Sequence, residues 1–291
     1  MTAADLSAIQ HALSDQYRFE RLLGQGGMGE VYLARDVMLE RHVAIKVLPA
    51  ADAGDGEQLE RFLREARTAA QLSHPHVVPI YFADQVAGQA FFVMSYVDGE
   101  SLAERLRARG PLPVSDVVRT MREVSWALAY AHARGVVHRD VKPENIMLER
   151  GTGRALVTDF GIAHSQDHTR LTLDGLVVGT VHYMSPEQVQ GHALDGRSDL
   201  YALGVLGFQA LSGRLPFEGA SASAILVAHL QSQPPSLRSV APQVPTSIAT
   251  VIDRCLSKDP AARFESGEAL ADALGAALEA AELEAARDEA G

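Results

Sequence analysis

Three glycines near the start of the chain have a spacing that suits phosphate binding. Gly24, Gly26 and Gly29 form the pattern G-x-G-x-x-G within LLGQGGMGEV, residues 22–31. Glycines let backbone N–H groups approach phosphate oxygens closely, where a Cβ atom would obstruct them. Two unrelated devices share this spacing: a turn from strand into helix that binds dinucleotides, and a β-hairpin whose tip covers nucleotide phosphates. The glycines alone do not distinguish these two devices.

The residues after Gly29 favour the hairpin. Val31 and Leu33 alternate with Glu30 and Tyr32, and the chain then returns through a second β-type run, RHVAIKVL. A dinucleotide-binding turn runs directly into a helix instead. The pattern therefore predicts strand, glycine tip, strand and strand, and it excludes a nicotinamide-dependent enzyme.

Lys46 ends the apolar run VAIK, so its ammonium group is expected on a strand with buried neighbours. A charge there is costly unless it has anionic partners. Bound phosphates would supply one partner. Glu65 would supply another, from a helical run in which Ala66 and Ala69 face the core. Taken alone, Lys46 fits better a lysine that extends from a strand end into solvent, so other motifs must decide.

Further motifs follow in order along the chain. HRDVKPEN, residues 138–145, places Asp140, Lys142 and Asn145 in a loop after a long helix, and DFG begins at Asp159. Together with the glycine loop, VAIK, the helical glutamate and SPE, this ordered set resembles the signature of the protein kinases. The resemblance covers about residues 17–277 and implies a bilobal α+β fold. It consists of a small antiparallel β-sheet lobe with one helix and a larger, mainly helical lobe.

The resemblance implies phosphoryl transfer from ATP, in which the protein chiefly positions the reactants and neutralises charge on the γ-phosphate. Asp140 would accept or orient the proton of the attacking hydroxyl, and Lys142 would steady the transferring phosphoryl group. Lys46 would hold the α- and β-phosphates, and Glu65 would hold Lys46. ATP is therefore the expected cosubstrate.

The resemblance also implies a metal site and an adenine site. Asn145 and Asp159 offer hard oxygen ligands for Mg²⁺, with Mn²⁺ as the alternative. The hinge that pairs its backbone with the adenine edge would run from Ser95 to Val97. Each residue around the ring also fits ordinary core packing. The expected adenine-site residues are Leu23, Val31, Ala44, Met94, Ser95, Val97 and Met147.

Lys142 followed by Pro143, and Thr180 in GTVHYMSPEQ, resemble the serine/threonine branch of the family more than the tyrosine branch. In that branch the Thr180 hydroxyl is expected beside the catalytic aspartate. GGMGEVYLARD, HPHVVPIY and GIAH look like the bacterial, eukaryotic-like (Hanks-type) kinases. The implied partners are proteins that carry Ser or Thr, including a second copy of this chain.

Two alternatives belong to other functional classes. A pseudokinase that serves as a binding or scaffold module would lack at least one of Lys46, Asp140, Asn145 or Asp159, and all four are present. A small-molecule kinase of related fold would not need GTVHYMSPEQ, which forms the peptide-docking platform in the family. Both alternatives are therefore less favoured than a protein kinase.

The polar segment HSQDHTRLTLDGLVVG, residues 164–179, carries Thr169 and Thr172. A phosphate on either threonine would order this loop if it met Arg139, which stands next to Asp140 and can donate two hydrogen bonds. We therefore predict autophosphorylation at Thr172 first and at Thr169 next. The alternative is a flexible polar loop in which these threonines matter little.

Hydrophobic periodicity predicts the elements that must position these residues. Short β-type runs, among them VVPIYFA at 77–83, extend from Tyr17 to about Met94, with one helical run from Glu57 to Leu72. A long helix precedes the HRD loop and ends at Gly135. Further helices are expected at 197–213, 221–231, 245–256 and 266–287. The first of these is apolar nearly all round, which suits the centre of a lobe.

These elements suggest lobes at about 17–94 and 99–277, joined by a hinge at 95–98. Residues 1–16 are expected to form an amphipathic helix with Leu6, Ile9 and Leu13 on one side. Residues 278–291 are Ala/Glu-rich and are expected to form an exposed helical tail or linker.

Composition limits the partners and the compartment. The 291 residues include 26 basic and 37 acidic side chains, and the net charge of −11 repels nucleic acid and anionic lipid, so no nucleic-acid partner is expected. No apolar run reaches the roughly 18 residues of a membrane span. A single cysteine, Cys255, suits a reducing compartment. We expect a cytoplasmic location, either for this chain alone or as the cytoplasmic domain of a longer membrane-anchored protein.

Overall fold

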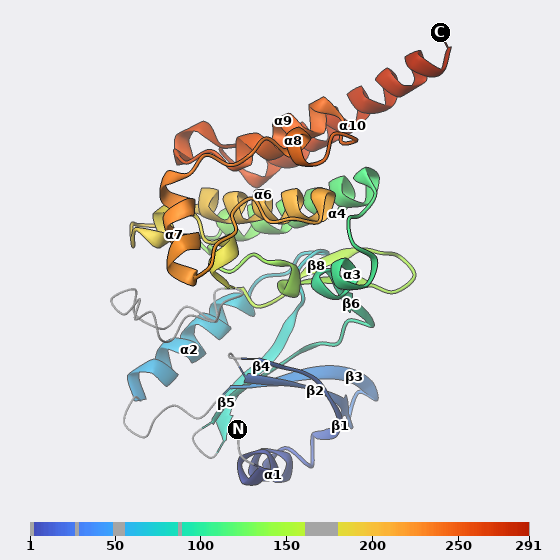
Figure 1. The fold of residues 1–291 in the computed structure, drawn as a ribbon. Coiled ribbons are helices and arrows are strands. Elements are labelled where there is room, and N and C mark those ends of the chain that lie inside the picture. The colour runs from blue at the N-terminus through green and yellow to red at the C-terminus, as the bar shows by residue number, and fades with distance from the viewer. Residues whose placement is uncertain (1–2, 27–28, 49–55, 87–88, 161–179, 291) are drawn as a thin grey trace. The chain divides into compact units, whose positions relative to one another are not determined.

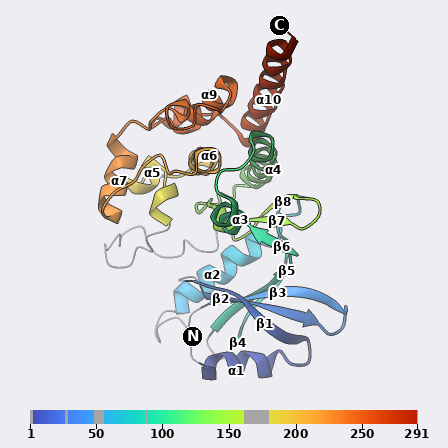
Figure 2. The same ribbon diagram turned by 45° about the vertical axis from the view of Figure 1, so that its right-hand side comes forward.

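The computed structural model describes residues 3–26, 29–48, 56–86, 89–160 and 180–290. These residues divide into a first unit, 3–73 and 77–98, and a second unit, 74–76 and 99–290, with the gaps just given. Figures 1 and 2 show the elements of each unit. The first unit contains α1 (Ala3–Ala12), β1 (Tyr17–Gly26), β2 (Gly29–Asp36), β3 (Arg41–Val47), α2 (Gly56–Ala69), β4 (Ile80–Val86) and β5 (Gln89–Ser95).

The strands of the first unit form one antiparallel sheet in the order β1-β2-β3-β5-β4. One face of this sheet is covered by α1 and the turn after it, because Ile9 of α1 and Leu13 join a buried cluster with Tyr32, Ile45 and other residues of the sheet. Helix α2 packs near β4 and β5 and lies on the other side of the sheet in both views (Figures 1 and 2). Helix α1 is shorter than the expected helical segment at 1–16, and together with Leu13 it completes the core of the first unit.

The second unit contains a small sheet and most of the helices. The sheet pairs β6 (Gly99–Ser101), β7 (Ile146–Glu149) and β8 (Ala155–Val157) in that order. The helices are α3 (Leu102–Arg109), α4 (Val114–His132), η1 (Pro143–Asn145), η2 (Thr180–Tyr183), α5 (Pro186–Val189), α6 (Gly196–Ser212), α7 (Ala222–Gln231), α8 (Leu237–Val240), α9 (Thr246–Cys255), η3 (Pro260–Ala262) and α10 (Gly267–Ala290).

Helix α6 forms the centre of the second unit, as its apolar sequence predicts. It packs against α4 and α9, and α10 packs against both of those helices (Figure 1). Two glycines allow this close approach. A Cβ at Gly204 would lie 2.5 Å from the Cys255 side chain, and one at Gly207 would lie 2.5 Å from the Met121 sulfur. Larger residues at these two positions would push the helices apart.

The predicted helices after the HRD loop are confirmed to within a few residues, since α6, α7, α9 and α10 match the expected ranges. The prediction for VVPIYFA is partly wrong. Strand β4 begins only at Ile80, because Pro79 has no N–H to donate to a strand ladder. The sheet of β6, β7 and β8 was not expected, since its strands span only three or four residues each. No helix among the described residues combines the length and the apolar character needed to cross a membrane.

Candidate active site

Asp140 lies in the loop between α4 and β7, and side chains of the same loop hold its carboxylate. Lys142 Nζ lies 2.7 Å from Asp140 Oδ2. The Asn145 amide nitrogen donates to the Asp140 backbone carbonyl at 2.7 Å and to Oδ2 at 3.1 Å. Asp140 is only 5% exposed, so the carboxylate is oriented by these contacts in a nearly dry environment. The structure thus brings Asp140, Lys142 and Asn145 together in one loop.

Asn145 and Asp159 are brought together by the β7–β8 hairpin. Ile146 pairs with Val157, so the residue before β7 and the residues after β8 lie at the same end of the hairpin. The Thr158 N–H donates to the Asn145 carbonyl at 3.0 Å, which extends this pairing by one step. The hairpin therefore places Asn145 and Asp159 at its same end, on the continuations of its two strands.

These two side chains fit a hard divalent cation. The Asn145 nitrogen is turned toward Asp140, which leaves the amide oxygen as its ligand atom. An amide oxygen and a carboxylate suit Mg²⁺, which proteins usually bind through one or two side chains together with substrate phosphates. The described residues contain no group of three or more His, Cys, Asp or Glu arranged for a metal. One amide oxygen and one carboxylate are a donor set that suits Mg²⁺ when phosphate oxygens complete its coordination.

Two residues of this region adopt a backbone conformation that is unusual outside glycine. Arg139 has φ 67° and Asp159 has φ 62°. Such conformations are costly and persist where the surroundings enforce them, often at functional sites. At Arg139 the enforcing group is Asp199, whose two carboxylate oxygens accept the N–H groups of His138 and Arg139 at 2.8 Å each.

Asp199 has a third contact, with His132. The His132 Nε2 atom lies 2.7 Å from Asp199 Oδ2. Asp199 is 1% exposed and stands in the first turn of α6, so the HRD loop, residues 138–145, is tied to the central helix of its unit. The sequence analysis missed Asp199 and His132. The signal for Asp199 was available, since a carboxylate in a helix that is otherwise apolar all round needs a buried partner.

The HRD and DFG motifs meet through His138. Its Nδ1 accepts the Asp140 N–H at 3.2 Å, and its Nε2 lies 2.8 Å from the Thr158 carbonyl. The hydrogen-bonding roles fit the tautomer with a proton on Nε2. The ring also packs on Phe160, with 4.7 Å between centroids. His138 therefore joins the loop of Asp140 to the chain that carries Asp159.

The SPE motif is anchored inside the second unit. Arg263 donates to both carboxylate oxygens of Glu187, at 2.7 and 2.9 Å, and Ser198 donates to Oε1 at 2.6 Å. Burial by itself would raise the pKa of Glu187, but the hydrogen bonds from Arg263 and Ser198 outweigh it and hold that pKa below its usual value. The expected pairing of Glu187 with Arg263 is confirmed.

The residue after Glu187 links this motif to the catalytic loop. Ser185 and Gln188 form a reciprocal cap at the start of α5, and the Gln188 amide donates to the Arg139 carbonyl at 2.8 Å. The chain before α5 includes Thr180, which lies in η2, although its side chain is outside the described residues. Gln188 is a further residue that the sequence analysis missed.

The glycine-rich stretch forms the predicted hairpin in the first unit. Gly24 and Gly26 end β1, Gly29 begins β2, and Gly26 pairs with Gly29. Gly29 is required by the fold, because its φ is +111° and a Cβ there would lie 2.1 Å from the Val47 carbonyl oxygen. A Cβ at Gly24 or Gly26 would meet no described atom within 4 Å. Packing against the described residues therefore does not explain these two glycines. They fit a position where a ligand approaches the backbone closely.

Lys46 lies on the face of the sheet opposite α1. Val31 pairs with Lys46, and Lys46 pairs with Phe92, so these side chains share a face. Ala44 and Met94 pair with each other and lie on the same face, two residues along. Lys46 is only 7% exposed, and its Nζ lies 5.8 Å from the centroid of the Phe92 ring. The sheet thus places the lysine and much of the expected adenine site in adjacent rows.

The other expected adenine residues are found in both units. Leu23 lies in β1, Ser95 ends β5, and Val97 follows it in the first unit. Met147 lies in β7 of the second unit, half-buried, opposite Leu156. Each of these residues is therefore placed only relative to the other residues of its own unit.

Three expected residues cannot be compared with their predicted contacts. Glu65 lies on α2, but its side chain is outside the described residues. Thr169 and Thr172 lie in 161–179, which is also outside them. Their assigned roles therefore stay predictions.

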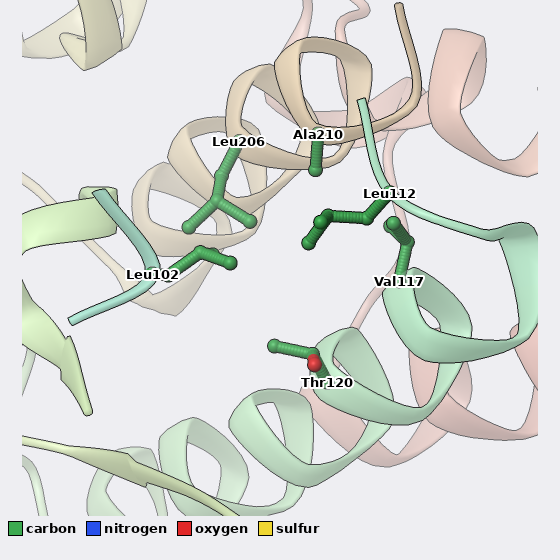
Figure 3. Close-up of a pocket in the computed structure, with 6 residues that line it drawn as sticks. All are labelled: Leu102, Leu112, Val117, Thr120, Leu206 and Ala210. Atoms are coloured by element: carbon green, nitrogen blue, oxygen red, sulfur yellow. The ribbon is translucent and has the colours of Figure 1, made fainter. Parts of the chain in front are cut away.

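The second unit also contains an apolar hollow away from these motifs. Figure 3 shows its lining side chains, which come from α3, α4, α6 and the link before α4. Thr120 supplies the one hydroxyl of the lining, and the other side chains are aliphatic. A hollow with a single hydroxyl among aliphatic side chains offers few polar groups to orient a ligand, so it suits imperfect packing rather than a binding site. Its lining consists of Leu102, Leu112, Val117, Thr120, Leu206 and Ala210.

Known proteins share this chain's sequence and fold. Residues 17–274 match the family described as "Protein kinase domain". The serine/threonine-protein kinase PrkC of Bacillus subtilis is 43% identical over 260 residues, which cover 89% of this chain and 40% of PrkC. PknA of Mycobacterium tuberculosis is 42% identical over 269 residues, which cover 91% of this chain and 62% of PknA. The chain thus spans about two fifths to three fifths of these relatives.

A solved structure gives the same result for the fold. The PknI kinase domain of Mycobacterium tuberculosis is 35% identical to this chain and superposes with a TM-score of 0.73, over 90% of this chain and 96% of that domain. The predicted α+β kinase fold is confirmed by this match. The catalytic-loop geometry, the ordered motifs and these comparisons agree, and the chain belongs to the protein kinase domain family.

Proposed function

We propose that this chain transfers the γ-phosphate of ATP to serine or threonine hydroxyls of proteins. The observation that carries the proposal is the arrangement around Asp140, where Lys142 Nζ and the Asn145 amide both contact the carboxylate. A pseudokinase is not favoured, because Lys46, Asp140, Asn145 and Asp159 are all present. The relatives PrkC and PknA are serine/threonine kinases by name, which supports the same specificity.

Asp140 is the proposed catalytic base. Its buried carboxylate accepts the proton of the attacking hydroxyl, or orients that hydroxyl through a hydrogen bond. Lys142, 2.7 Å from Asp140, places a positive charge where the transferred phosphoryl group gains negative charge. Thr180, in η2 before the SPE motif, is proposed to help dock the substrate hydroxyl.

We propose that different residues bind the metal ion and the phosphates. Asn145 and Asp159 would hold Mg²⁺, or Mn²⁺ in its place, which would supply charge neutralisation on the ATP phosphates. Lys46 would bind the α- and β-phosphates from the sheet, with Glu65 as its partner. The hairpin of Gly24, Gly26 and Gly29 would cover the phosphates, with backbone N–H groups as donors.

The adenine ring would be held by apolar side chains of the sheet and by the hinge. Val31, Ala44 and Met94 share the face that carries Lys46, which supports their role. Ser95 and Val97 would pair with the adenine edge through their backbone groups. Leu23 and Met147 would complete the apolar enclosure of the ring.

We also propose phosphorylation of Thr172, and next of Thr169, by a second copy of this chain. Arg139 supports this proposal, since its backbone is held by Asp199 and its guanidinium can donate two hydrogen bonds to a phosphate. The single cysteine, Cys255, is free and buried, which supports a reducing compartment such as the cytoplasm.

Phosphate transfer from labelled ATP, to the chain itself and to a basic carrier protein, tests the proposal. The matched control is Asp140→Asn, which keeps the side-chain shape but cannot accept the hydroxyl proton as a carboxylate does. We expect transfer with Mg²⁺ or Mn²⁺ that the control lacks, with label on Ser and Thr. Equal transfer by the two proteins would refute the enzyme assignment, and label on tyrosine would refute the specificity.

Mass spectrometry after incubation with ATP tests the proposed modification sites. We expect phosphate on Thr172 and, at lower occupancy, on Thr169. A protein that transfers phosphate to the carrier yet carries none between residues 162 and 180 would contradict the proposed autophosphorylation.

A further inference from the structure

Two side chains donate hydrogen bonds to the carboxylate of Glu30, one residue pair away from the glycine tip. The Gln25 side-chain amide donates to Glu30 Oε1 at 2.8 Å, and the Tyr32 hydroxyl donates to Glu30 Oε2. Gln25 and Glu30 are opposite each other in the β1–β2 pairing, and the next pair toward the tip is Gly26 with Gly29. The Glu30 carboxylate therefore ties the two strands together one pair away from the glycines.

Tyr32 connects this carboxylate to the core of the first unit. Tyr32 is 7% exposed and belongs to the cluster that includes Ile9 of α1 and Leu13, the residue after that helix. Its ring also contacts Phe19 edge-on, with 5.6 Å between centroids. Burial first, and the hydrogen bond to Glu30 second, raise the pKa of Tyr32, so the hydroxyl keeps its proton and remains a donor.

The Glu30 side chain lies on the same face of β2 as Tyr32. Side chains alternate across a strand, so Glu30 and Tyr32 share one face of β2 while Val31 takes the other. Tyr32 packs in the α1 cluster, and Val31 pairs with Lys46 on the opposite face. The Glu30 carboxylate therefore lies on the face away from the proposed phosphate-binding lysine, which excludes it as a phosphate ligand.

We infer that Glu30 is a positioning residue for the nucleotide phosphates, which fixes the glycine-rich hairpin through Gln25 and Tyr32. The inference rests on the proposed kinase function. A hairpin that is already ordered loses little conformational entropy when ATP binds, whereas a loosened hairpin must be ordered at the expense of affinity. Because the acceptor is a carboxylate, its hydrogen bonds are stronger than those of a neutral group in the same place.

Four single variants of the full chain test this inference. Glu30→Ala removes the acceptor, Glu30→Gln keeps the shape without the charge, Tyr32→Phe removes one donor, and Gln25→Ala removes the other. Glu40→Gln is the matched control, since it removes a carboxylate from the exposed turn at the opposite end of β2. Thermal unfolding of each variant shows whether it is folded at the assay temperature.

We expect Glu30→Ala to raise the KM for ATP about tenfold, which corresponds to about 1.4 kcal/mol of binding free energy. The KM for the protein substrate should not change, and kcat should fall less than the ATP affinity does. Tyr32→Phe and Glu30→Gln should give smaller increases in the KM for ATP. A double variant of Glu30→Ala with Tyr32→Phe should equal Glu30→Ala alone, because Glu30→Ala already removes the hydrogen bond that Tyr32→Phe removes.

Hydrogen exchange of the free protein gives a readout that does not depend on catalysis. We expect the backbone amides at the tip ends of β1 and β2 to exchange faster in Glu30→Ala than in the unmodified protein or in Glu40→Gln. If Glu30→Ala is unstable, the exchange of the same amides is compared in Tyr32→Phe, because that variant keeps the ring in the core.

Unchanged KM for ATP and unchanged hairpin exchange in Glu30→Ala would overturn the inference. Additive effects in the double variant would also overturn it, since they would show that Glu30 and Tyr32 act separately. Failure of the proposed function is distinct, because the unmodified protein would then transfer no phosphate while the exchange experiment still reported on the hairpin.

Discussion

At the scale of single residues, the catalytic loop depends on a carboxylate outside the expected reacting set. Asp199 accepts the N–H groups of His138 and Arg139 and also contacts His132. These bonds hold Arg139 at a φ of 67°, which a non-glycine residue seldom adopts. The position of Asp140, the next residue, therefore depends on Asp199.

Asp199→Asn should lower kcat and leave the KM for ATP nearly unchanged. The neutral amide has one accepting oxygen and one NH2 donor, so one buried N–H loses its acceptor and the other keeps only an uncharged one. The expected fall in kcat is about tenfold to a hundredfold, since each such hydrogen bond is worth about 1.5–3 kcal/mol. Steady-state kinetics of the two proteins would measure this.

The control for this variant is Asp195→Asn. Asp195 caps the same helix by accepting the Arg197 N–H at 2.8 Å, and asparagine caps helices equally well. Its kinetics should match those of the unmodified protein. A similar loss of kcat in both variants would show that α6 is merely destabilised and that Asp199 has no positioning role.

At the scale of elements, helix α1 stabilises the sheet that carries Lys46. Ile9 is 0% exposed and Leu13 is 5% exposed, and both lie in the cluster beneath β2, β3 and β5. Without α1 that apolar face would be open to water, which is unfavourable in proportion to the exposed area. The N-terminal segment is therefore part of the folded first unit.

Ile9→Ala should lower the free energy of unfolding by about 2–5 kcal/mol, the range for large-to-small changes in a core. His11→Ala, an exposed change on the same helix, should alter it by less than about 0.5 kcal/mol. Urea unfolding followed by circular dichroism measures both. Equal stability of the two variants would show that α1 does not contribute to the core.

Helix α7 is held by a buried histidine that makes its packing sensitive to acid. The Tyr201 hydroxyl lies 2.9 Å from His229 Nδ1, and the Phe217 ring lies 4.8 Å from the His229 ring. Lys258 Nζ donates to the His229 carbonyl at 2.7 Å. Burial first, and the charge of Lys258 second, lower the pKa of His229 to about 4.

The sign of the pH effect follows from this shift. Between pH 6.5 and about 4 the unfolded chain protonates His229 while the folded protein keeps it neutral, so stability falls as the pH falls through this window. His229→Gln should remove this part of the pH dependence, whereas the exposed His192→Gln should not. Unfolding free energies at pH 7 and pH 4.5 measure the difference, and parallel pH dependence in all three proteins would contradict the prediction.

At the scale of the whole molecule, the one cysteine of the chain reports on the opening of the second unit. Cys255 is 0% exposed at the end of α9, and its Cβ faces Gly204 of α6. Burial raises the pKa of the Cys255 thiol to about 12, so little reactive thiolate forms. Modification therefore requires that the packing of α6 against α9 opens.

We expect a thiol reagent to label the native protein slowly and the urea-unfolded protein rapidly, with one label per chain in both cases. The labelling rate in low urea should rise with the population of the opened form. Fast labelling of the native protein at neutral pH would show that α9 is not packed as described. Cys255→Ser provides the blank for the reagent.

Much of the fold and the site could be predicted from the sequence, because local pattern and chemistry agree there. The period of apolar residues predicted α6, α7, α9 and α10, since their length makes the pattern reliable. The strand VVPIYFA was predicted too long because Pro79 outweighs the apolar pattern. The sheet of β6, β7 and β8 was missed because three or four residues are too few to show alternation.

The sequence by itself determined the kinase resemblance and the residue set of Asp140, Lys142, Asn145 and Asp159, since motif order and residue type carry that information. Only the tertiary structure decided what holds those residues. Asp199 reaches the catalytic loop from 60 residues away, and Glu30 gains its role from the pairing of β1 with β2. The physical reason is that a hydrogen bond depends on distance and direction in space, which residue spacing does not report for partners on separate elements.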